Sequence, residues 1–264
     1  MPARTSPTPS AVNAVVVAGG FASRDLADVA GEHRKGLIRL GGREALYYVL
    51  EALQGSRGVD KIALVGPEEM ESLANGVTFV AEGTNVSQNI LRGIGALGME
   101  EVTEPVLVIP SDLPLLRSED IEGFLARLPS GLGAAASFVR RERVEREQPG
   151  APYTYIKVRE GQFATGGITM VTPAVARCLA DLIQQLHESR KSQLRVALMC
   201  GLGLLVRFRL GRLRIDEGVR AVRRLVGEDV WVDLDASPRT SLDLDGPEDY
   251  LYLRDNWDRL RSPQ

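Results

Sequence analysis

The sequence predicts an α/β protein with a Rossmann-like, doubly wound, mostly parallel sheet. Three observations predict this fold class: short apolar runs rich in β-branched residues, helical periodicity between the runs, and glycine or proline where the runs end. A strand that is covered by helices on both faces carries apolar side chains at every position, so it forms an unbroken apolar run. Such runs alternating with helical segments are typical of a parallel sheet.

The first half of the chain alternates strands with helices. The expected strands are residues 14–18, 61–65, 77–80 and 105–109, and the expected helices are 43–55, 85–97 and 118–127. Ser118 is the expected N-cap of the last helix, because serine hydroxyls accept hydrogen bonds from the free amides of a first turn. Residues 21–34 are expected to be a long polar loop, and loops of that length often act as functional lids.

The second half of the chain is less regular. The expected strands are residues 134–139, 153–158, 168–171 and 230–234, and the expected helices are 173–189, 215–227 and 247–257. Residues 140–148 are a charged segment that is either a loop or a solvated helix. Residues 1–11 are expected to be a disordered tail.

Composition excludes several classes of protein. The chain has 264 residues with 44% hydrophobic and 25% charged residues, which excludes a disordered, collagen-like or disulfide-scaffold protein. A net charge of −3 gives no general nucleic-acid footprint. The stretch Arg190–Arg224 nevertheless carries ten basic and two acidic residues, a local charge of +8 that leaves −11 for the remaining chain.

Cysteine content and apolar runs indicate a location. Cys178 and Cys200 are the two cysteines of the chain, and they favour reduced thiols in a cytoplasmic compartment. The apolar run at 196–206 has 11 residues, whereas a membrane span needs about 20. We therefore expect a cytoplasmic protein with no export signal and no membrane anchor.

The first candidate ligand site follows the first strand. Ala18, Gly19 and Gly20 stand where that strand leaves the sheet, at the edge where doubly wound proteins bind ligands. Glycine permits positive φ and lets backbone amides approach an anion closely. Alternatively, the pair is a plain turn, and the spacing matches neither a dinucleotide-binding fingerprint nor a phosphate-binding P-loop.

Two charged residues are placed at the same edge. Lys35 ends the polar loop and could reach a triphosphate as a mobile point charge; alternatively it is a solvated lysine. Asp112 follows the strand at 105–109 between two prolines, which suits a Mg²⁺ ligand, since Mg²⁺ binds one or two carboxylates together with substrate phosphates. The alternative for Asp112 is a turn cap.

Two Asp-x-Asp pairs follow later in the chain. Asp243 and Asp245 precede the last helix, and alternate residues of an extended segment share one face. Asp233 and Asp235 repeat the pattern, so the spacing by itself does not identify a metal site. The two histidines have no partner at metal-ligand spacing, which argues against zinc.

Taken in order, these segments resemble the MobA-like nucleotidyltransferases, whose Rossmann-like fold is of the glycosyltransferase-A (nucleotide-diphospho-sugar transferase) type. The resemblance covers roughly residues 12–255. The segments that carry it are Ala18-Gly19-Gly20, Lys35-Gly36-Leu37, Gly41-Gly42-Arg43, Tyr48-Val49-Leu50, Ser111-Asp112-Leu113-Pro114-Leu115, Gly166-Gly167 and Asp243-Leu244-Asp245-Gly246-Pro247-Glu248-Asp249.

The resemblance implies a role for each candidate residue. The loop at residues 18–20 would wrap the base and phosphates of a nucleoside triphosphate (NTP), and Lys35 would contact the phosphates. Asp112 would hold Mg²⁺ with Asp245 as the second metal ligand, although the pattern alone leaves Asp243 open for that role. The remaining implied contacts are Ser87 and Asn89 with the base or ribose, and Gly166 and Gly167 with the acceptor.

These inferences predict a Mg²⁺-dependent nucleotidyltransferase that moves a nucleoside monophosphate from an NTP to a small phosphorylated or hydroxyl acceptor. Since residues 112 and 245 must meet in one site, we expect a single domain at 12–258 with a helical insertion at about 173–227. That insertion includes the whole basic stretch, which either attracts an anionic acceptor or forms solvated helix faces. The alternatives are a glycosyltransferase that uses a nucleotide-sugar and a non-catalytic nucleotide-binding protein. We expect neither nucleic acid nor membrane as a partner.

Overall fold

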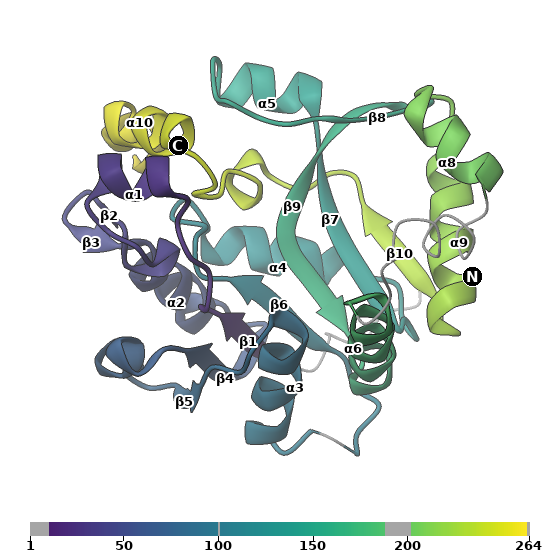
Figure 1. Ribbon diagram of the computed structural model, residues 1–264, viewed down its shortest axis with the longest axis horizontal. Coiled ribbons are helices and arrows are strands. Elements are labelled where there is room, and N and C mark those ends of the chain that lie inside the picture. The colour runs from purple at the N-terminus through teal and green to yellow at the C-terminus, as the bar shows by residue number, and fades with distance from the viewer. Residues whose placement is uncertain (1–10, 100, 188–201, 263–264) are drawn as a thin grey trace, which may run out of the picture.

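The protein has the predicted α/β fold, built on one large, mostly parallel sheet (Figure 1). The computed structural model describes residues 11–99, 101–187 and 202–262. In the large sheet the strands lie in the order β10-β7-β9-β6-β1-β4-β5, and β8 pairs with β9. The bounds are β1 Val12–Val17, β4 Val59–Gly66, β5 Thr78–Ala81, β6 Val106–Pro110, β7 Ala134–Arg140, β8 Ile156–Val158, β9 Gly161–Val171 and β10 Val230–Asp233; β2 Arg39–Leu40 and β3 Arg43–Glu44 form a small hairpin.

The strand directions determine which loops meet. Strands β5, β4, β1 and β6 are mutually parallel, so the loops that follow them emerge at one edge of the sheet. Strand β9 runs antiparallel to β6, β7 and β8. The carboxyl-end loops of β1, β5 and β6 therefore surround a common space, which is the position of ligand sites in doubly wound sheets.

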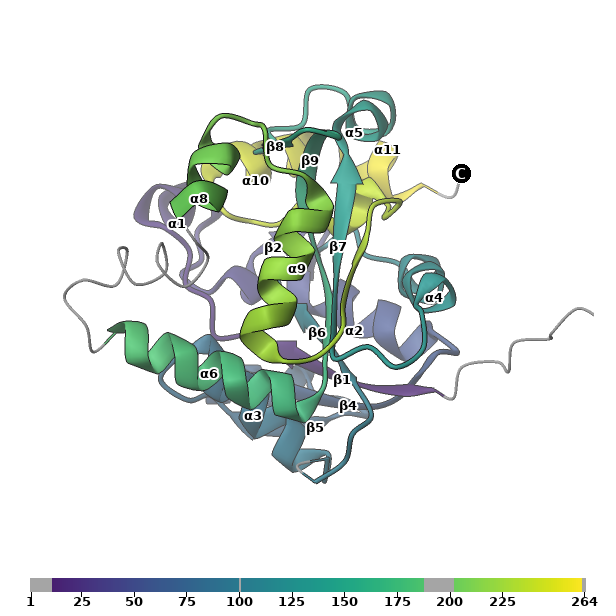
Figure 2. The ribbon, with the colours of Figure 1, turned by 90° about the vertical axis from the view of Figure 1, so that its right-hand side faces the viewer.

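Helices cover both faces of the sheet. Alternate residues of β1 divide between the faces: Ala14 and Val16 pack with α2 and α4, and Val15 packs with α3. In Figure 2, α3, α6 and α9 lie on one side of the sheet and α4 lies on the other. The helix bounds are α1 Arg24–Ala30, α2 Ala45–Gly55, α3 Val86–Ala96, α4 Ser118–Arg127, α5 Arg141–Glu147, α6 Pro173–His187, α8 Leu202–Arg209, α9 Ile215–Val226, α10 Pro247–Asp255 and α11 Trp257–Arg261, with 3-10 turns η1 Lys35–Leu37, η2 Glu68–Leu73 and η3 Pro238–Thr240.

The segment at 21–34 is not a continuous polar loop, because it contains α1. The Ser23 side chain accepts a hydrogen bond from the Leu26 amide, and the helix ends at Gly31 with φ of 72°. Leu26 is fully buried and anchors the helix. Both ends of α1 thus carry standard capping residues, and the high polarity of the segment concealed a helix with one narrow buried face.

Three further boundaries differ from the sequence prediction. Strand β9 continues through 165–167, which were expected to separate two strands, because its residues keep pairing with β7 across an irregularity near Ser137. The predicted final helix is interrupted at Asn256 into α10 and α11. The N-cap position of α4 is Arg117 rather than Ser118, whose hydroxyl instead donates to the Ala52 carbonyl.

The predicted helical insertion is described in part. Helices α6, α8 and α9 lie within it, while Cys200 and residues 190–201 of the basic stretch lie outside the described residues. Cys178 is a free thiol whose sulfur lies 3.6 Å from the Leu225 carbonyl. Across the described ranges, no helix combines the length and apolar character that a bilayer crossing would require.

Candidate active site

A cavity of about 400 Å³ opens at the carboxyl edge of the sheet. Its walls come from the segments that follow β1, β5 and β6. The lining residues are Val17, Gly19, Gly20, Phe21, Lys35, Glu82, Gly83, Thr84, Asn85, Val86, Asn89, Pro110, Ser111 and Asp112. We call this space the edge cavity.

Glycine at position 19 is required by close approach. A Cβ atom there would clash with Glu82 Oε2 and would lie 3.0 Å from Asn89 Nδ2. Neither Gly19 nor Gly20 has a positive φ, so crowding rather than backbone conformation selects glycine at position 19. The Gly20 carbonyl accepts a hydrogen bond from the Lys35 amide at 3.1 Å, which ties the two ends of the 21–34 segment together.

Phe21 and Glu82 of the edge cavity contact a cation outside its wall, which is held between the aromatic ring and two acids. The Arg34 guanidinium lies 3.8 Å from the centroid of the Phe21 ring, and it is 2.8 Å from Glu82 and 3.4 Å from Glu69. Arg34 also donates to the Gly19 carbonyl at 3.2 Å. The sequence analysis missed both Arg34 and Phe21, since nothing in their spacing distinguishes them from solvated loop residues.

The segment after β5 closes the opposite wall. Asn89, which is buried, accepts a hydrogen bond from the Gly83 amide at 2.6 Å and so orders residues 82–84. Ser87 is half-buried and does not line the cavity, although Asn89 does. Glu82 and Thr84 were missed by the sequence analysis, yet they follow a strand that it predicted and lie at the edge where it expected ligands.

Three carboxylates converge beside Lys35. Asp112, Asp243 and Asp245 each offer an oxygen, and these oxygens lie within 4.8 Å of one another. Lys35 Nζ lies 3.4 Å from Asp112 Oδ2 and forms a close ion pair with Asp245 Oδ1. The structure therefore places the two candidate Asp-x-Asp carboxylates next to Asp112, as the site prediction required.

Burial dominates the electrostatics of Asp112, which is 8% exposed. Its burial raises its pKa, and the attraction of the nearby Lys35 ammonium offsets this only in part. The second oxygen, Oδ1, is buried without a hydrogen-bond partner among the described residues. An unpartnered buried carboxylate oxygen is rare in folded proteins and indicates that something else binds there.

Asp243 and Lys35 respond to the same crowding in different ways. Burial, together with the charges of Asp112 and Asp245, raises the pKa of Asp243 to about 7. Burial lowers the pKa of Lys35, but the hydrogen bonds and charges of the two aspartates outweigh it and leave that pKa raised. The cluster thus holds more negative charge than one lysine neutralises.

This arrangement fits a hard divalent cation. Carboxylate oxygens are the ligands that Mg²⁺ prefers, and it combines them with water and substrate phosphates. A cation in the cluster would give the unpartnered Asp112 oxygen a partner, and its positive charge would lower the raised pKa of Asp243. The residues present therefore fit Mg²⁺.

A second, smaller cavity of about 120 Å³ lies on the other side of Asp243 and Asp245. We call it the inner cavity. Its lining residues are Pro152, Tyr153, Thr154, Ala164, Thr165, Ser241, Leu242, Asp243, Asp245 and Asp249. Neither cavity is lined by Gly166 or Gly167. A Cβ atom at 166 would clash with Ser137 Oγ and one at 167 with Leu113 Cδ1, so these glycines let β9 pack closely against its neighbours.

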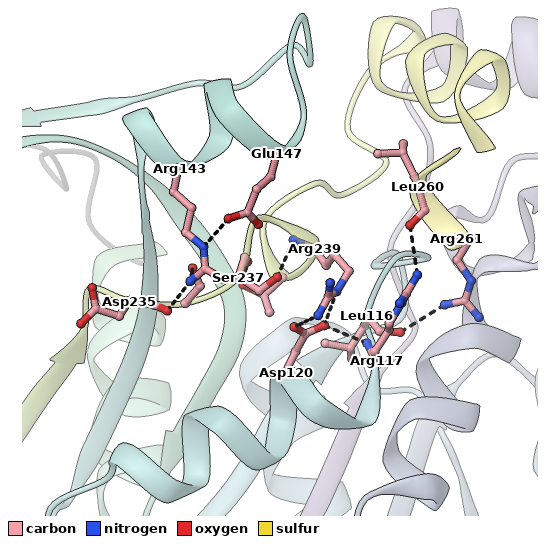
Figure 3. Close-up of polar contacts among 12 residues, drawn as sticks. Leu116, Arg117, Asp120, Arg143, Glu147, Asp235, Ser237, Arg239, Leu260 and Arg261 are labelled. Carbon is pink, nitrogen blue, oxygen red and sulfur yellow. Dashed lines mark hydrogen bonds and ion pairs between the residues drawn. The ribbon is translucent and has the colours of Figure 1, made fainter. Parts of the chain in front are cut away.

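A buried ion pair attaches the C-terminal segment to α4 (Figure 3). Arg239 donates to both oxygens of Asp120, at 2.7 and 3.0 Å, and the Asp120 side chain is 2% exposed. Asp120 also accepts from the Arg117 amide at 3.0 Å. This pair joins the helix that follows the Asp112 loop to the turn that precedes Asp243.

Two more arginines extend the same connection (Figure 3). Arg117 donates to the carbonyls of Leu260 and Ser262, at 3.2 and 2.9 Å, and Arg261 donates to the Leu116 carbonyl at 3.4 Å. These contacts attach the loop after β6 to α11. Together with the Asp120–Arg239 pair, they connect the segment that follows Asp112 with the segments on either side of Asp243 and Asp245.

Most of the predicted site residues lie at the edge cavity, but Ala18, Ser87 and the glycine pair at 166–167 do not line it. Gly19, Gly20, Lys35, Asn89 and Asp112 line the edge cavity, and Asp245 contacts Lys35. Ala18 is fully buried, and its amide donates to the Val65 carbonyl at 2.8 Å, so it supports the loop from below. Ser87 and the pair at 166–167 lie outside the cavity walls.

Comparison with known proteins identifies similar chains. A family model described as the MobA-like NTP transferase domain matches residues 14–199. The curated bifunctional protein GlmU of Azorhizobium caulinodans is 30% identical over 129 residues, which are 46% of this chain and 28% of that protein. The chain thus spans little more than a quarter of the length of that relative.

Two solved structures extend the comparison over nearly the whole chain. A hypothetical transferase from Thermus thermophilus is 27% identical with a TM-score of 0.75, covering 90% of this chain and 99% of its own. A CMP:2-keto-3-deoxy-manno-octonic acid synthetase complexed with CTP is 14% identical with a TM-score of 0.59, covering 95% of this chain and 99% of its own. The first likeness extends to sequence, whereas the second is a likeness of fold.

Proposed function

This chain belongs to the MobA-like NTP transferase domain family, and from that premise we propose that it is a Mg²⁺-dependent nucleotidyltransferase. It transfers a nucleoside monophosphate from an NTP to a small acceptor and releases pyrophosphate. The chain acts in the cytoplasm, where NTPs are available, and residues 12–258 act as one domain because Asp112 and Asp245 belong to one site.

The observation that carries the proposal is the meeting of three carboxylates and one lysine at the mouth of the edge cavity. The glycine-lined wall of that cavity lets a nucleotide approach the backbone at Gly19 and Gly20. The triphosphate then lies between the loop after β1 and the carboxylates. Similarity to a synthetase structure that contains CTP supports an NTP as the donor.

Catalysis in this site is positioning combined with charge neutralisation. The acceptor oxygen attacks the α-phosphorus in line with the bond to the leaving pyrophosphate, so no protein nucleophile is needed. Asp112, Asp243 and Asp245 would hold the Mg²⁺, which supplies Lewis-acid stabilisation of the phosphate charge. Asp112 and Asp245 would be the primary ligands, and Asp243 would complete the set.

Lys35 changes partner during binding. In the structure its ammonium neutralises Asp112 and Asp245. When those carboxylates are occupied, the ammonium is free to turn toward the phosphates, since the aliphatic part of the Lys35 side chain already lies beside Gly20. A cation at that place stabilises the charge that develops on the leaving group.

The nucleoside half of the donor is held by the walls of the edge cavity. Phe21, with Arg34 on its ring, offers an exposed aromatic surface for stacking, and Asn89 and Glu82 offer polar groups. Ser87, in the first turn of α3, would contact the base or ribose from outside the cavity wall. The acceptor occupies the inner cavity, which Thr165 of β9 lines, and Gly166 and Gly167 next to it let β9 pack closely against Ser137 and Leu113.

A glycosyltransferase of the same fold is the rival enzyme. It would release a free nucleoside diphosphate or monophosphate from a nucleotide-sugar, whereas a nucleotidyltransferase releases pyrophosphate from an NTP. A non-catalytic nucleotide-binding protein would release neither. Analysis of the released products therefore separates the three functions.

The test is pyrophosphate release from each of the four NTPs with Mg²⁺ and a small-molecule extract as the acceptor source. The wild type is expected to release pyrophosphate, and Asp112→Asn is expected to remove that activity. Asp235→Asn is the matched control, because the Asp235 side chain is exposed and lies outside both cavities. Equal rates for Asp112→Asn and the wild type would contradict the proposal.

Donor binding is measured separately by thermal shift with each NTP and Mg²⁺. A ligand that binds only the folded state stabilises it by about 2.7 kcal/mol at a hundredfold excess over its dissociation constant. We expect one base to give the largest shift. Absence of any shift with all four NTPs would remove the basis of the proposal.

A further inference from the structure

A third cavity, of about 490 Å³, lies between the sheet and the helices α8 and α9. We call it the outer cavity. We propose that this side of the molecule docks on a membrane that contains anionic lipids, with lipid hydrocarbon on the outer cavity and anionic head groups on the cations beside it. The sequence analysis expected no membrane partner because the apolar run is too short to span a bilayer, but binding at the surface requires no span.

The lining of the outer cavity is almost entirely hydrocarbon. One wall is the sheet face of β7, β9 and β10, and the other is α9, which lies in front of that face in Figure 2. The polar side chains among the described lining residues are those of Thr169 and Arg214. Thr169 donates to the Val108 carbonyl at 3.0 Å, and Arg214 lies 3.3 Å from Asp216, so both are already engaged. This wall offers little to a polar ligand and fits an apolar one.

The volume of the outer cavity is sufficient for part of a hydrocarbon chain. A dry apolar cavity of roughly 150 Å³ binds benzene, and the outer cavity is about three times as large. Water in this space would face apolar side chains on almost every side. Hydrocarbon that enters it removes that apolar surface from water, which is the favourable term in apolar binding.

Large apolar side chains next to the outer cavity face solvent. Val206, Phe208 and Leu210 are 51%, 44% and 59% exposed, although they stand within five consecutive residues. Phe208 also lines the outer cavity, as does Val222, which is 40% exposed. Phe208 thus joins the cavity to the exposed side chains around it. A contiguous exposed apolar surface of this kind marks an interaction site.

Four exposed cations stand around the turn that joins α8 to α9. A Cβ atom at Gly211 would lie 3.0 Å from Lys157 Cγ, so the lysine side chain lies against this turn. The Arg159 amide donates to the Leu213 carbonyl at 2.8 Å, which places Arg159 beside the same turn. We call the four the basic cluster: Lys157, Arg159, Arg209 and Arg212. Within the ranges that the structure describes, none of the four forms an ion pair.

The acids nearest to the basic cluster in the sequence are paired with other arginines. Glu217 forms a close ion pair with Arg207, and Glu160 lies 3.8 Å from Arg214. Residues 202–226 contain seven basic and two acidic residues, so this segment has a charge of +5 while the rest of the chain has −8. Near an anionic bilayer, each unpaired cation strengthens binding about fivefold.

The combination of cations and apolar side chains favours a lipid surface over other partners. Arginines next to exposed Phe, Leu and Val are typical of segments that bind at the bilayer interface. A nucleic acid would satisfy the basic cluster but leave Val206, Phe208 and Leu210 against a polar partner. A peptide would bring backbone amides and carbonyls, to which the described lining of the outer cavity offers few partners. A two-fold dimer would bring two identical basic surfaces together, because its interface uses the same patch on both subunits.

The test is sedimentation of the full chain with lipid vesicles at low salt. One preparation contains phosphatidylcholine and phosphatidylglycerol in equal parts, and the other contains phosphatidylcholine alone. We expect the chain to bind the anionic vesicles at least about tenfold more tightly than the neutral ones. Salt should release it, because exposed charges are screened. Equal binding to both preparations, or binding to neither, would overturn the inference.

A double substitution tests the basic cluster. Arg209→Gln together with Arg212→Gln should weaken binding to the anionic vesicles about 25-fold, since two cations are removed. Arg57→Gln together with Lys61→Gln is the control with the same change of charge, because both side chains are exposed and lie outside the outer cavity. If the two double variants bind alike, the basic cluster does not contact the membrane and the inference is wrong.

A single substitution tests the exposed apolar side chains. Leu210→Ser should weaken vesicle binding about tenfold, because the hydrocarbon contact of one leucine is lost. Its melting temperature should stay unchanged, since the side chain is exposed. Val29→Ser is the matched control: Val29 on α1 is 46% exposed, and α1 and α8 lie at opposite sides of Figure 1. Wild-type binding by Leu210→Ser would contradict the apolar part of the proposal.

Contact with lipid hydrocarbon is measured with Phe208→Trp and anionic vesicles whose acyl chains carry bromine, which quenches nearby indole fluorescence. The wild type is the control, because Trp231 packs with Phe124 and Trp257 packs with Tyr48. We expect the added indole to be quenched on binding. Binding without quenching would mean adsorption by charge alone and would overturn the assignment of the outer cavity.

Self-association and nucleotidyl transfer are tested separately. A dimer in sedimentation velocity that Leu210→Ser dissociates, together with no binding to vesicles, would assign this surface to a second copy and overturn the inference. The described residues that line the outer cavity line neither of the other two cavities. Pyrophosphate release by the Leu210 and Arg209–Arg212 variants should therefore equal that of the wild type, so a failure of this inference leaves the proposed function standing.

Discussion

The two Asp-x-Asp pairs, at 233 and 235 and at 243 and 245, have the same spacing and opposite surroundings. Asp233 ends β10, and its side chain is 1% exposed. Asp243 and Asp245 lie in the segment between η3 and α10, beside Lys35 and Asp112. Asp233 is thus a buried structural carboxylate, whereas Asp243, ten residues later, belongs to a cluster that can bind a cation.

The first pair is satisfied within the protein. Arg127 donates to both oxygens of Asp233, at 2.6 and 3.1 Å, and the Asp235 amide donates to Asp233 at 3.0 Å. The Asp235 side chain points to solvent and lies 3.8 Å from Arg140. Asp233 therefore has its partners within the protein, and the Asp235 carboxylate faces solvent.

The second pair lacks enough positive charge. Asp112 and Asp245 share the ammonium of Lys35, Asp243 lies beside them, and one oxygen of Asp112 has no partner among the described residues. A carboxylate with its own bidentate arginine stabilises the fold, whereas carboxylates that share one lysine remain available for a cation. The comparison teaches that the partner, rather than the spacing, decides the role of such a pair.

The largest expected effect comes from the second pair. Asp243→Asn should lower kcat by about 10²–10³-fold, close to the loss of one transition-state-stabilising group. The melting temperature should remain the same or rise, because one buried like charge is removed. Steady-state pyrophosphate release and thermal melting measure both quantities, and a variant that lost stability together with activity would contradict the contrast between the pairs.

The next largest effect is expected at the first pair, where a substitution should lower stability and leave kcat unchanged. Asp233→Asn should lower the free energy of unfolding by about 3 kcal/mol, since it breaks a buried ion pair on one side. The kcat of the folded enzyme should be unchanged. Urea denaturation measures the stability, and Asp235→Asn is the control with an expected change within about 0.5 kcal/mol.

The raised pKa of Asp243 predicts that Mg²⁺ binding at the second pair depends on pH. The pKa of Asp243 is about 7, so below that pH a proton competes with the cation, and the apparent dissociation constant for Mg²⁺ should increase by up to about tenfold per pH unit. In the metal-free protein, the same proton should make the folding stability fall as the pH rises. Its folded state keeps this proton up to about pH 7 while the unfolded state loses it near pH 4, so this group lowers stability as pH rises through that range.

Titrating the rate with Mg²⁺ at pH 6, 7 and 8 measures the apparent dissociation constant for Mg²⁺. Denaturation of the metal-free protein at the same pH values measures its stability. Asp243→Asn should flatten both pH dependences. A dissociation constant that does not change with pH would contradict competition between a proton on Asp243 and the cation.

The smallest expected effect concerns the connection between α4 and the C-terminal segment. Arg239→Lys replaces a bidentate contact to Asp120 with a single one, which should cost about 1 kcal/mol of stability. If the pair positions Asp243 and Asp245, the Mg²⁺ concentration for half-maximal rate should rise a fewfold while the KM for NTP stays constant. A loss of stability with an unchanged Mg²⁺ requirement would make the pair purely structural.

Much of the fold follows from local sequence rules. The strands β1, β4, β5 and β6 are apolar runs because helices cover both of their faces, and this made them recognisable. The helix α1 was missed because only one narrow face of it is apolar. The continuation of β9 through Gly166 was missed because glycines there fit close strand packing as well as a loop.

Local sequence patterns are sufficient to predict which residues stand at the carboxyl edge of the sheet. Gly19, Gly20 and Asp112 are each adjacent to the end of a strand, and a local pattern is enough to place them. The packing of distant segments shows which Asp-x-Asp pair joins them: Asp243 and Asp245 lie beside Asp112. The physical reason is that local patterns determine a residue's position on its own strand or helix, while contacts between distant segments depend on how the whole chain packs.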